Sequence, residues 1–312
     1  MSRNFKIREQ KTTLIRRIVQ ISAFIFINYA IIEFIFSINL LSFEGTVKIL
    51  PILNSPRNPI SDGTGFTEFI FFSISEGEFP FFVIAIFLLV ILFSGRASCG
   101  WLCPIGTIQD AISAISSKKR TVRLDRHETY LNIKYVIFVP VFLIIMAMGI
   151  TRNLNIVYYF EIKEFLGAFG QKPLSYFSLS EYIFVFFPNT ITQMVDAQGL
   201  GPLFSNFLVF FTFVFYLAIL IVAVWHPRAY CRYLCPYAAM SSAVSDYSFL
   251  KLSRSPVKCV GRTECGKCEK VCPKQIRILD EPFEFFTGRG ECNLCLKCMQ
   301  ECPYDAIKIK FG

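Results

Sequence analysis

The sequence predicts a mainly α-helical protein in which four membrane-spanning helices precede a small α+β domain. Three observations support this fold class: long apolar stretches almost without charge, a cysteine motif that occurs twice, and a cysteine-rich C-terminal segment. The chain has 312 residues, of which 54% are hydrophobic. That share is too high for an ordinary soluble domain. A membrane part and a soluble part are therefore expected.

Four apolar stretches are each long enough to cross a bilayer. A hydrocarbon core of about 30 Å needs roughly 20 helical residues, and the backbone inside it must satisfy its own hydrogen bonds as a helix. The alternative for any one stretch is a buried helix of a soluble domain. The expected spans of this four-helix transmembrane bundle are residues 18–41, 79–98, 133–151 and 203–226, within a membrane domain of residues 18–249.

Lysine and arginine are distributed unevenly between the segments that connect the spans. Residues 1–17 hold six and residues 96–131 hold six, whereas residues 44–78 hold two and residues 152–196 hold three. The positive-inside rule therefore predicts a multi-pass protein of the inner (cytoplasmic) membrane, with the N-terminus and the C-terminus in the cytoplasm. The net charge of +9 follows from this topology. No basic-aromatic motif indicates nucleic acid as a partner.

All twelve cysteines lie on the predicted cytoplasmic side, where thiols stay reduced, so metal or redox chemistry is expected. The last four form a C-x2-C-x2-C-x3-C-P run, the pattern of bacterial ferredoxins. An upstream run repeats it with the first spacing stretched from two residues to five. In such runs the first three thiolates bind one cluster and the fourth binds the other. A zinc ribbon, the alternative, has paired C-x2-C knuckles.

Residues 250–312 are therefore predicted to form a bacterial-ferredoxin-like α+β domain with two 4Fe-4S clusters. A short strand near residues 304–309 closes the domain. The predicted ligands are Cys259, Cys265, Cys268 and Cys302 for one cluster, and Cys292, Cys295, Cys298 and Cys272 for the other.

The motif that occurs twice is CxxxCP, at residues 99–104 and 231–236. The segments around it, GRASCGWLCPIG and PRAYCRYLCPYA, align without a gap, and each follows a predicted span and precedes an amphipathic stretch. Two such helix–CxxxCP units packed side by side are expected to bring their thiols together at the inner surface of the membrane. The four thiols are Cys99, Cys103, Cys231 and Cys235.

We predict that these four thiols form one site for an additional iron-sulfur centre or a metal ion. Arg96 and Arg228 would offset its negative charge. Two alternatives remain: redox-active dithiols that exchange electrons, and small buried packing residues.

These features in combination resemble a known family. The RRIVQ opening of the first span, the ISD segment at residues 60–62, the CxxxCP motifs and the double-cluster tail are similar to NapH-type membrane quinol dehydrogenases of periplasmic nitrate reduction. NosR-type proteins and CcoG-type copper-reducing assembly factors share that membrane core. The resemblance covers nearly the whole chain, although the stretched Cys259–Cys265 spacing departs from it. It implies quinol oxidation, with electrons passing through redox partner subunits toward a terminal reductase.

Glu33 is the only acidic residue within a predicted span, which makes it a functional-site candidate. The hypothesis is a proton acceptor beside a quinol head group, and the alternative is a helix-pairing acid near the outer interface. A membrane b-haem is not expected, because His127 and His226 are the only histidines and both lie on the cytoplasmic side. The alternative functions are copper or iron handling and a relay anchor without its own quinone site.

Overall fold

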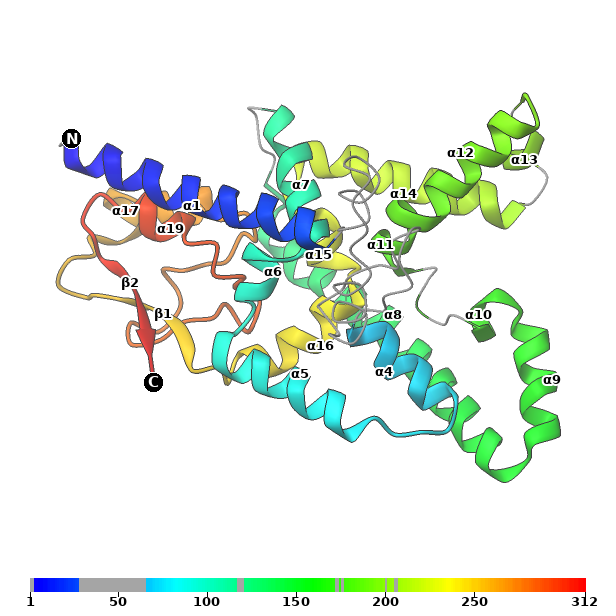
Figure 1. Cartoon of the computed structure of the whole chain (residues 1–312). Helices are drawn as coiled ribbons and strands as arrows, with labels where there is room; N and C mark the ends of the chain where they lie inside the picture. Colours follow the sequence, from blue (N-terminus) through cyan, green and yellow to red (C-terminus); the bar gives the residue numbers. More distant parts are fainter. Residues whose placement is uncertain are drawn as a thin grey trace.

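The computed structural model describes residues 3–27, 66–116, 121–171, 174, 177–199, 201–204 and 207–312. Most of this part is helical, as the sequence predicts. Both chain ends lie on the same side of the molecule, beside the C-terminal domain (Figure 1). Glu33 and the ISD segment lie outside the described residues.

The helices before the C-terminal domain differ widely in length. The long ones are α1 (Arg3–Ile27), α8 (Leu124–Leu154) and α14 (Phe207–Trp225); those of intermediate length are α4 (Phe66–Ser75), α5 (Phe81–Ser94), α7 (Pro104–Ile115), α9 (Ile156–Leu166), α12 (Phe187–Asp196) and α16 (Pro236–Ser245). The short ones are α6 (Ala97–Trp101), α10 (Ala168–Gln171), α11 (Leu179–Glu181), α13 (Gly201–Phe204), α15 (Ala229–Tyr233) and the π-helix η2 (Tyr182–Phe186).

Two helices of the described part are long and apolar enough to cross a membrane. They cover residues Arg126–Leu154 and Phe207–Trp225 and correspond to the predicted spans 133–151 and 203–226. The predicted span 79–98 is a shorter apolar helix, α5, because Pro80 precedes it and Gly95, with a φ of 58°, ends it. Only the beginning of the span 18–41 is described, as the end of α1. The four-helix bundle therefore remains a prediction.

The duplicated unit is visible in the backbone. In each copy a short helix, α6 or α15, carries the first cysteine, and a longer helix, α7 or α16, begins with the proline of the motif. The second cysteine stands immediately before that proline with nearly the same dihedral angles in both copies: φ −64° and ψ 121° for Cys103, φ −62° and ψ 119° for Cys235. The two hexapeptides thus fold alike.

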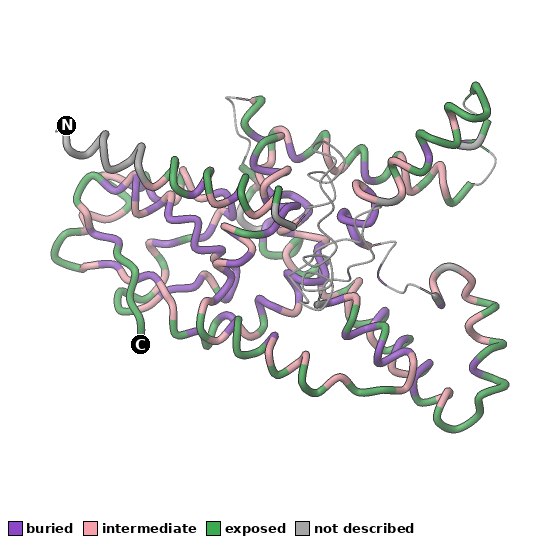
Figure 2. Tube along the Cα trace, viewed as in Figure 1, coloured by how far each residue is buried: buried purple, intermediate pink, exposed green. Residues whose placement is uncertain are grey.

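The C-terminal domain is built around one antiparallel pair of strands. Strand β1 (Leu250–Arg254) pairs with β2 (Ile307–Phe311), so that Leu250 lies opposite Phe311 and Arg254 opposite Ile307. Between the strands lie three short helices, α17 (Gly261–Glu264), α18 (Lys267–Val271) and α19 (Lys297–Gln300). Buried residues are concentrated in this domain and where it meets the duplicated unit, whereas the peripheral helices are largely exposed (Figure 2).

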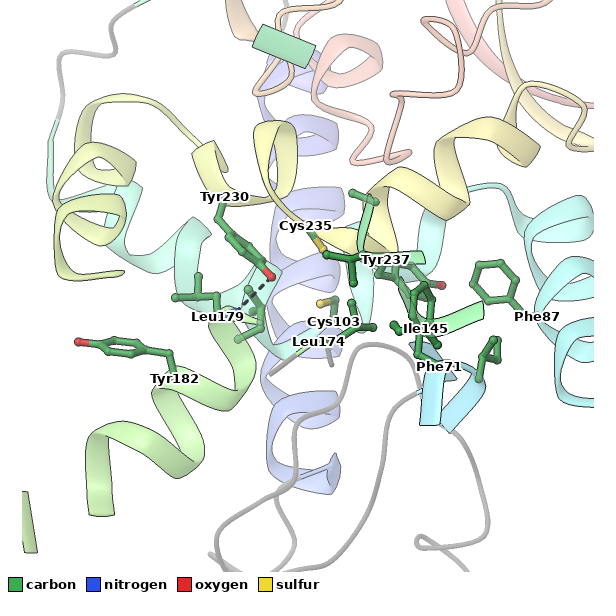
Figure 3. Packing of buried hydrophobic residues seen from close by; sticks show 14 of the residues in the cluster. Phe71, Phe87, Cys103, Ile145, Leu174, Leu179, Tyr182, Tyr230, Cys235 and Tyr237 are labelled. Carbon is green, nitrogen blue, oxygen red and sulfur yellow. Dashed lines mark hydrogen bonds between the residues drawn. The ribbon is translucent and has the colours of Figure 1, made fainter. Parts of the chain in front are cut away.

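The main hydrophobic cluster lies where the apolar helices meet the two CxxxCP motifs. Cys103 and Cys235 belong to it, side by side among buried aromatic and aliphatic side chains (Figure 3). Tyr230 is buried there and is fixed by two hydrogen bonds: its hydroxyl accepts from the Leu179 amide at 3.1 Å and donates to the Phe177 carbonyl at 2.8 Å. The cysteine motifs therefore sit at the base of the apolar helices.

Candidate iron-sulfur site

The four CxxxCP cysteines line one cavity. Cys99, Cys103, Cys231 and Cys235 meet there, together with Arg96, Arg228 and Lys274. The structure thus brings the predicted thiols and both predicted arginines to one place, and adds a lysine from the C-terminal domain. The two copies of the repeat supply two thiols each, as expected for units that pack side by side.

The same hydrogen bonds shape both cysteine turns. The Cys103 amide donates to the Ser98 carbonyl at 3.0 Å, and the Cys235 amide donates to the Tyr230 carbonyl at the same distance. Each second cysteine therefore stands at the N-terminus of the helix that follows, where free amides favour a negatively charged group. Burial raises the pKa of Cys103 well above its usual value and that of Cys235 to about 12. Without a metal, these thiols are neutral.

Arg228 links the second copy of the repeat to the first. Its guanidinium donates to both oxygens of Asp110 in α7, and Nη1 donates to the Cys99 carbonyl at 2.9 Å. Although burial opposes ionisation, Arg228 holds the pKa of Asp110 far below its usual value. The arginine is thus both a lining residue of the cavity and a bridge between the two cysteine turns.

Arg96 connects the first copy to the C-terminal domain. Its Nη1 donates to the Gly290 carbonyl at 3.1 Å and to the Glu291 carboxylate at 3.0 Å. Lys134 of α8 also pairs with Glu291, and Lys274 Nζ lies 3.6 Å from it. Against the effect of burial, these cations, Arg96 first, lower the pKa of Glu291 to about 2. Glu291 therefore stays ionised at the centre of the interface.

The predicted inner ligands, Cys272, Cys292, Cys295 and Cys298, form a second group of neighbouring thiols. Burial, together with the adjacent Cys295 and Cys272, raises the pKa of Cys292 to about 12. Burial likewise raises the pKa of Cys298, with contributions from the other three. Leu294 and Leu296, with φ of 47° and 60°, bend the loop between these ligands.

The predicted outer ligands, Cys259, Cys265, Cys268 and Cys302, line a second cavity. The five residues between Cys259 and Cys265 include the helical turn α17, and Cys259 still lies beside the other three. Arg254 Nη1 lies 3.6 Å from its sulfur. The stretched spacing therefore does not separate Cys259 from its predicted partners.

The inner group lies between the CxxxCP cavity and the outer group. Lys274, two residues after Cys272, donates to the Cys231 carbonyl at 3.0 Å. On the other side, Cys268 of the outer group contributes to raising the pKa of Cys298 in the inner group. The twelve cysteines are thus arranged as three groups of four in a row.

The N-terminal helix α1 lies across the cysteine groups and forms hydrogen bonds with both the first cysteine turn and the inner group. Arg16 donates to the Cys295 carbonyl at 3.1 Å and to Asp110 at 2.6 Å, while Gln20 donates to the Gly100 carbonyl at 3.0 Å. Trp101 of the first cysteine turn donates to the Leu294 carbonyl at 2.9 Å. The membrane part and the C-terminal domain are therefore held in close contact.

The charges buried around the cysteines test whether iron-sulfur clusters fit. In the described part, seven buried lysines and arginines face only three buried carboxylates: Arg16, Arg96, Lys134, Arg228, Arg232, Arg254 and Lys274 against Asp110, Glu181 and Glu291. Uncompensated buried cations are costly. A 4Fe-4S cube with four thiolates carries net negative charge. Such cubes in the cysteine groups would supply the missing anions, so the residues present fit them.

Several residues of the site were not singled out from the sequence. Asp110 carries a usable signal, because it is the one acidic residue of an amphipathic helix that directly follows a cysteine motif. Lys274 and Glu291 carry none, since their roles depend on how the C-terminal domain docks. Within the described residues, no three His, Cys, Asp or Glu side chains gather closely enough to hold a single metal ion.

The comparisons with known proteins agree with this geometry. A family model described as a 4Fe-4S binding domain matches residues 77–123 and 208–255, so each match contains one CxxxCP motif. The duplicated unit therefore matches this family model twice. No solved structure matches the chain.

Three relatives define the relationship. YccM of Escherichia coli, named for a role in electron transport, is 28% identical over 238 residues, which is 74% of this chain and 57% of YccM. Regulatory protein NosR of Pseudomonas aeruginosa is 26% identical over 69% of this chain and 25% of NosR. Ferredoxin-type protein NapH of E. coli is 22% identical over 76% of this chain and 71% of NapH.

The fold and the cysteine groups define an iron-sulfur electron-transport protein. More narrowly, its sequence is similar to the NapH/NosR-type ferredoxin-type electron-transport proteins. The matching part is a little over half of YccM and a quarter of NosR.

Proposed function

We propose that this protein is a multi-pass membrane protein that oxidises quinol and passes the electrons toward a terminal reductase. One observation carries the proposal: the CxxxCP cavity at the base of the apolar helices adjoins the inner cysteine group through Lys274, and the inner group adjoins the outer one. A row of redox centres in this order leads electrons away from a membrane.

The three cysteine groups would each hold one 4Fe-4S cluster, which supplies one-electron transfer when bound. Cys99, Cys103, Cys231 and Cys235 would hold the cluster nearest the membrane, in place of a single metal ion. The buried cations stabilise the negative charge of these centres. Arg96 and Arg228 also hold the cysteine turns in place through their pairs with Glu291 and Asp110. The chain's own part is to exclude water and to fix the spacing of the centres.

The predicted orientation gives each end of the row a task. With both termini in the cytoplasm, the outer cysteine group faces a redox partner subunit in that compartment. Val257, which is 93% exposed, and Tyr304, which is 47% exposed, lie beside that group and offer contact surface. The lipid and the quinol pool meet the other end. Glu33, which is predicted to lie toward the outer side of the first span, is a separate hypothesis for a proton acceptor beside a quinol head group.

Iron content tests the number of centres. Three clusters give about twelve irons per chain and two give about eight. We expect anaerobically prepared protein to hold about twelve, and Cys103→Ala and Cys235→Ala to hold about eight. A wild type with about eight irons, matched by both variants, would contradict the shared cluster and leave thiol exchange or packing.

Quinol oxidation is tested separately. Reduction of the clusters by a short-chain quinol, followed by optical spectroscopy, is expected in the wild type, and Glu33→Gln should slow it without loss of iron. An unchanged rate would refute the role of Glu33. Clusters that quinol does not reduce, together with copper bound at the CxxxCP thiols, would instead favour metal handling.

A further inference from the structure

A ligand-sized cavity lies between the first turns of α8 and the C-terminal domain. Its volume is about 430 Å³, within the range of roughly 300–1,000 Å³ that is typical of small-molecule sites. On α8, Leu131 and Tyr135 line it together with three polar residues, His127, Glu128 and Asn132. Lys274, Gly288 and Glu291 form part of the wall on the C-terminal domain. The cysteine row described above does not use this space.

The buried part of the cavity combines a hydrogen-bond donor with an acceptor. Lys274 and Glu291 are almost fully buried and lie 3.6 Å apart. The ammonium of Lys274 has three donors, of which one is used by the Cys231 carbonyl. Glu291 already accepts from Arg96 and Lys134, and its two oxygens have lone pairs for a further donor. A ligand with two ring oxygens, one accepting from Lys274 and one donating to Glu291, matches this pair.

The same two residues flank the candidate cluster ligands. Glu291 directly precedes Cys292, and Lys274 follows Cys272 by two residues and contacts the backbone of Cys231. A molecule that reaches Lys274 and Glu291 therefore lies beside both the CxxxCP group and the inner group. A ligand in this cavity could therefore exchange electrons with either cysteine group.

The open side of the cavity borders apolar and aqueous surfaces. After Tyr135, α8 presents Val136, which is 69% exposed, and Val139, which lies one helical turn beyond Tyr135 and is 49% exposed, as expected for a lipid-facing surface. The exposed carboxylates of Glu128, which is also on α8, and of Asp280 line the cavity as well. An amphiphile with an apolar tail and a polar ring fits this boundary, whereas a wholly water-soluble ligand would leave the apolar side unused.

We propose that this cavity binds the head group of a membrane quinone or quinol, with its isoprenoid tail directed along α8. The proposal rests on the proposed quinol oxidation and specifies where the quinol binds. It places the head group at the α8 end of the C-terminal domain, beside Lys274 and Glu291, and is therefore an alternative to a head group beside Glu33.

Photo-crosslinking with an azido derivative of a short-chain ubiquinone tests the proposal on the full-length, cluster-loaded protein, with an azido-naphthoquinone in parallel. We expect crosslinks in residues 127–135 or 274–291, and their loss with excess unlabelled quinone. Leu131→Trp fills the cavity and should reduce crosslinking at least fivefold with unchanged iron content. Ile133→Trp, on the same helix but outside the cavity, is the matched control and should leave crosslinking unchanged.

The contrary results are distinguishable. Competed crosslinks elsewhere in the chain, or crosslinks that Leu131→Trp does not reduce, would overturn this site and leave quinol oxidation in place. Fully iron-loaded protein without any competed crosslink to either probe would overturn quinol oxidation, and this site with it.

Discussion

Arg228 holds both carboxylate oxygens of Asp110: its Nε lies 2.9 Å from Oδ1 and its Nη2 lies 2.8 Å from Oδ2. The two residues come from different copies of the repeat, so this buried pair joins the two cysteine turns. Arg16 and Gln20 of α1 donate to the same carboxylate, at 2.6 and 3.1 Å. Asp110 therefore connects three elements of the fold at one point.

We expect Asp110→Asn to destabilise the protein by about 3–5 kcal/mol, because it leaves two buried guanidinium groups without their carboxylate. The midpoint of thermal or denaturant unfolding in detergent measures this. Asp280→Asn is the matched control, since the same change there affects exposed pairs with Arg262 and Arg277, worth at most about 1 kcal/mol. Equal midpoints for the two variants would refute the central role of Asp110.

The structure brings the cysteines together in the groups that their spacing predicts, because the spacing of thiols along a chain largely determines which clusters they can reach; their ligation of clusters stays a prediction. The gapless repeat similarly predicts one cavity for four thiols, since identical turns after packed helices must face one another. These inferences need only local geometry and a two-fold repeat. They extend to Cys259, whose neighbours the structure places as expected despite its stretched spacing.

What the sequence does not predict depends on docking between the membrane part and the C-terminal domain. Arg96 was expected to offset thiolate charge, but its closest anionic partner is Glu291, nearly two hundred residues away. The role of α1 was likewise not foreseen, because Arg16 looks like one of six basic residues at a cytoplasmic end. Its burial against Asp110 and Cys295 follows from packing alone.

The crossed ligation gives a second prediction. Cys302→Ala should remove the same electron paramagnetic resonance signal as Cys265→Ala, although Cys302 ends the other cysteine run, and Cys272→Ala should remove the same signal as Cys298→Ala. Each variant should lose about four irons. Cys259→Ala belongs with the first pair. If Cys302→Ala and Cys298→Ala removed the same signal, each cysteine run would bind its own cluster. Cys302 and Cys272 would then have to be exchanged between the two ligand sets.

Gly100 gives a third prediction, about the fit between the first cysteine turn and the C-terminal domain. A β-carbon there would lie 2.1 Å from the Asn293 carbonyl oxygen, so the backbones must move apart in Gly100→Ala. We expect a cost of about 1–3 kcal/mol and faster hydrogen exchange in residues 288–296. Gly201→Ala, which meets no atom within 4 Å, is the control. Unchanged exchange in Gly100→Ala would show that the two parts do not pack this tightly.

Arg232 gives the last prediction, since it is fully buried and has no carboxylate partner in the described part of the chain. Its Nη2 contacts His127 and Gln275, its guanidinium lies over the Tyr233 ring, and the groups that act on its charge are Tyr233, Cys272 and Glu291. A buried cation stabilises the more negative, reduced form of a nearby cluster, so its loss should lower that cluster's reduction potential.

We expect Arg232→Gln to lower one potential by on the order of 50–100 mV, the effect of roughly 2 kcal/mol from a unit charge about 7–8 Å away at an effective dielectric of ~20. A redox titration followed by electron paramagnetic resonance measures it. The affected signal should be the one that Cys298→Ala removes, because Arg232 lies beside Cys272. Arg277→Gln removes an exposed arginine of the same region and should shift no potential by more than a few tens of millivolts. A potential that rises in Arg232→Gln, or a shift confined to the outer cluster, would refute the assignment of Arg232 to the inner group.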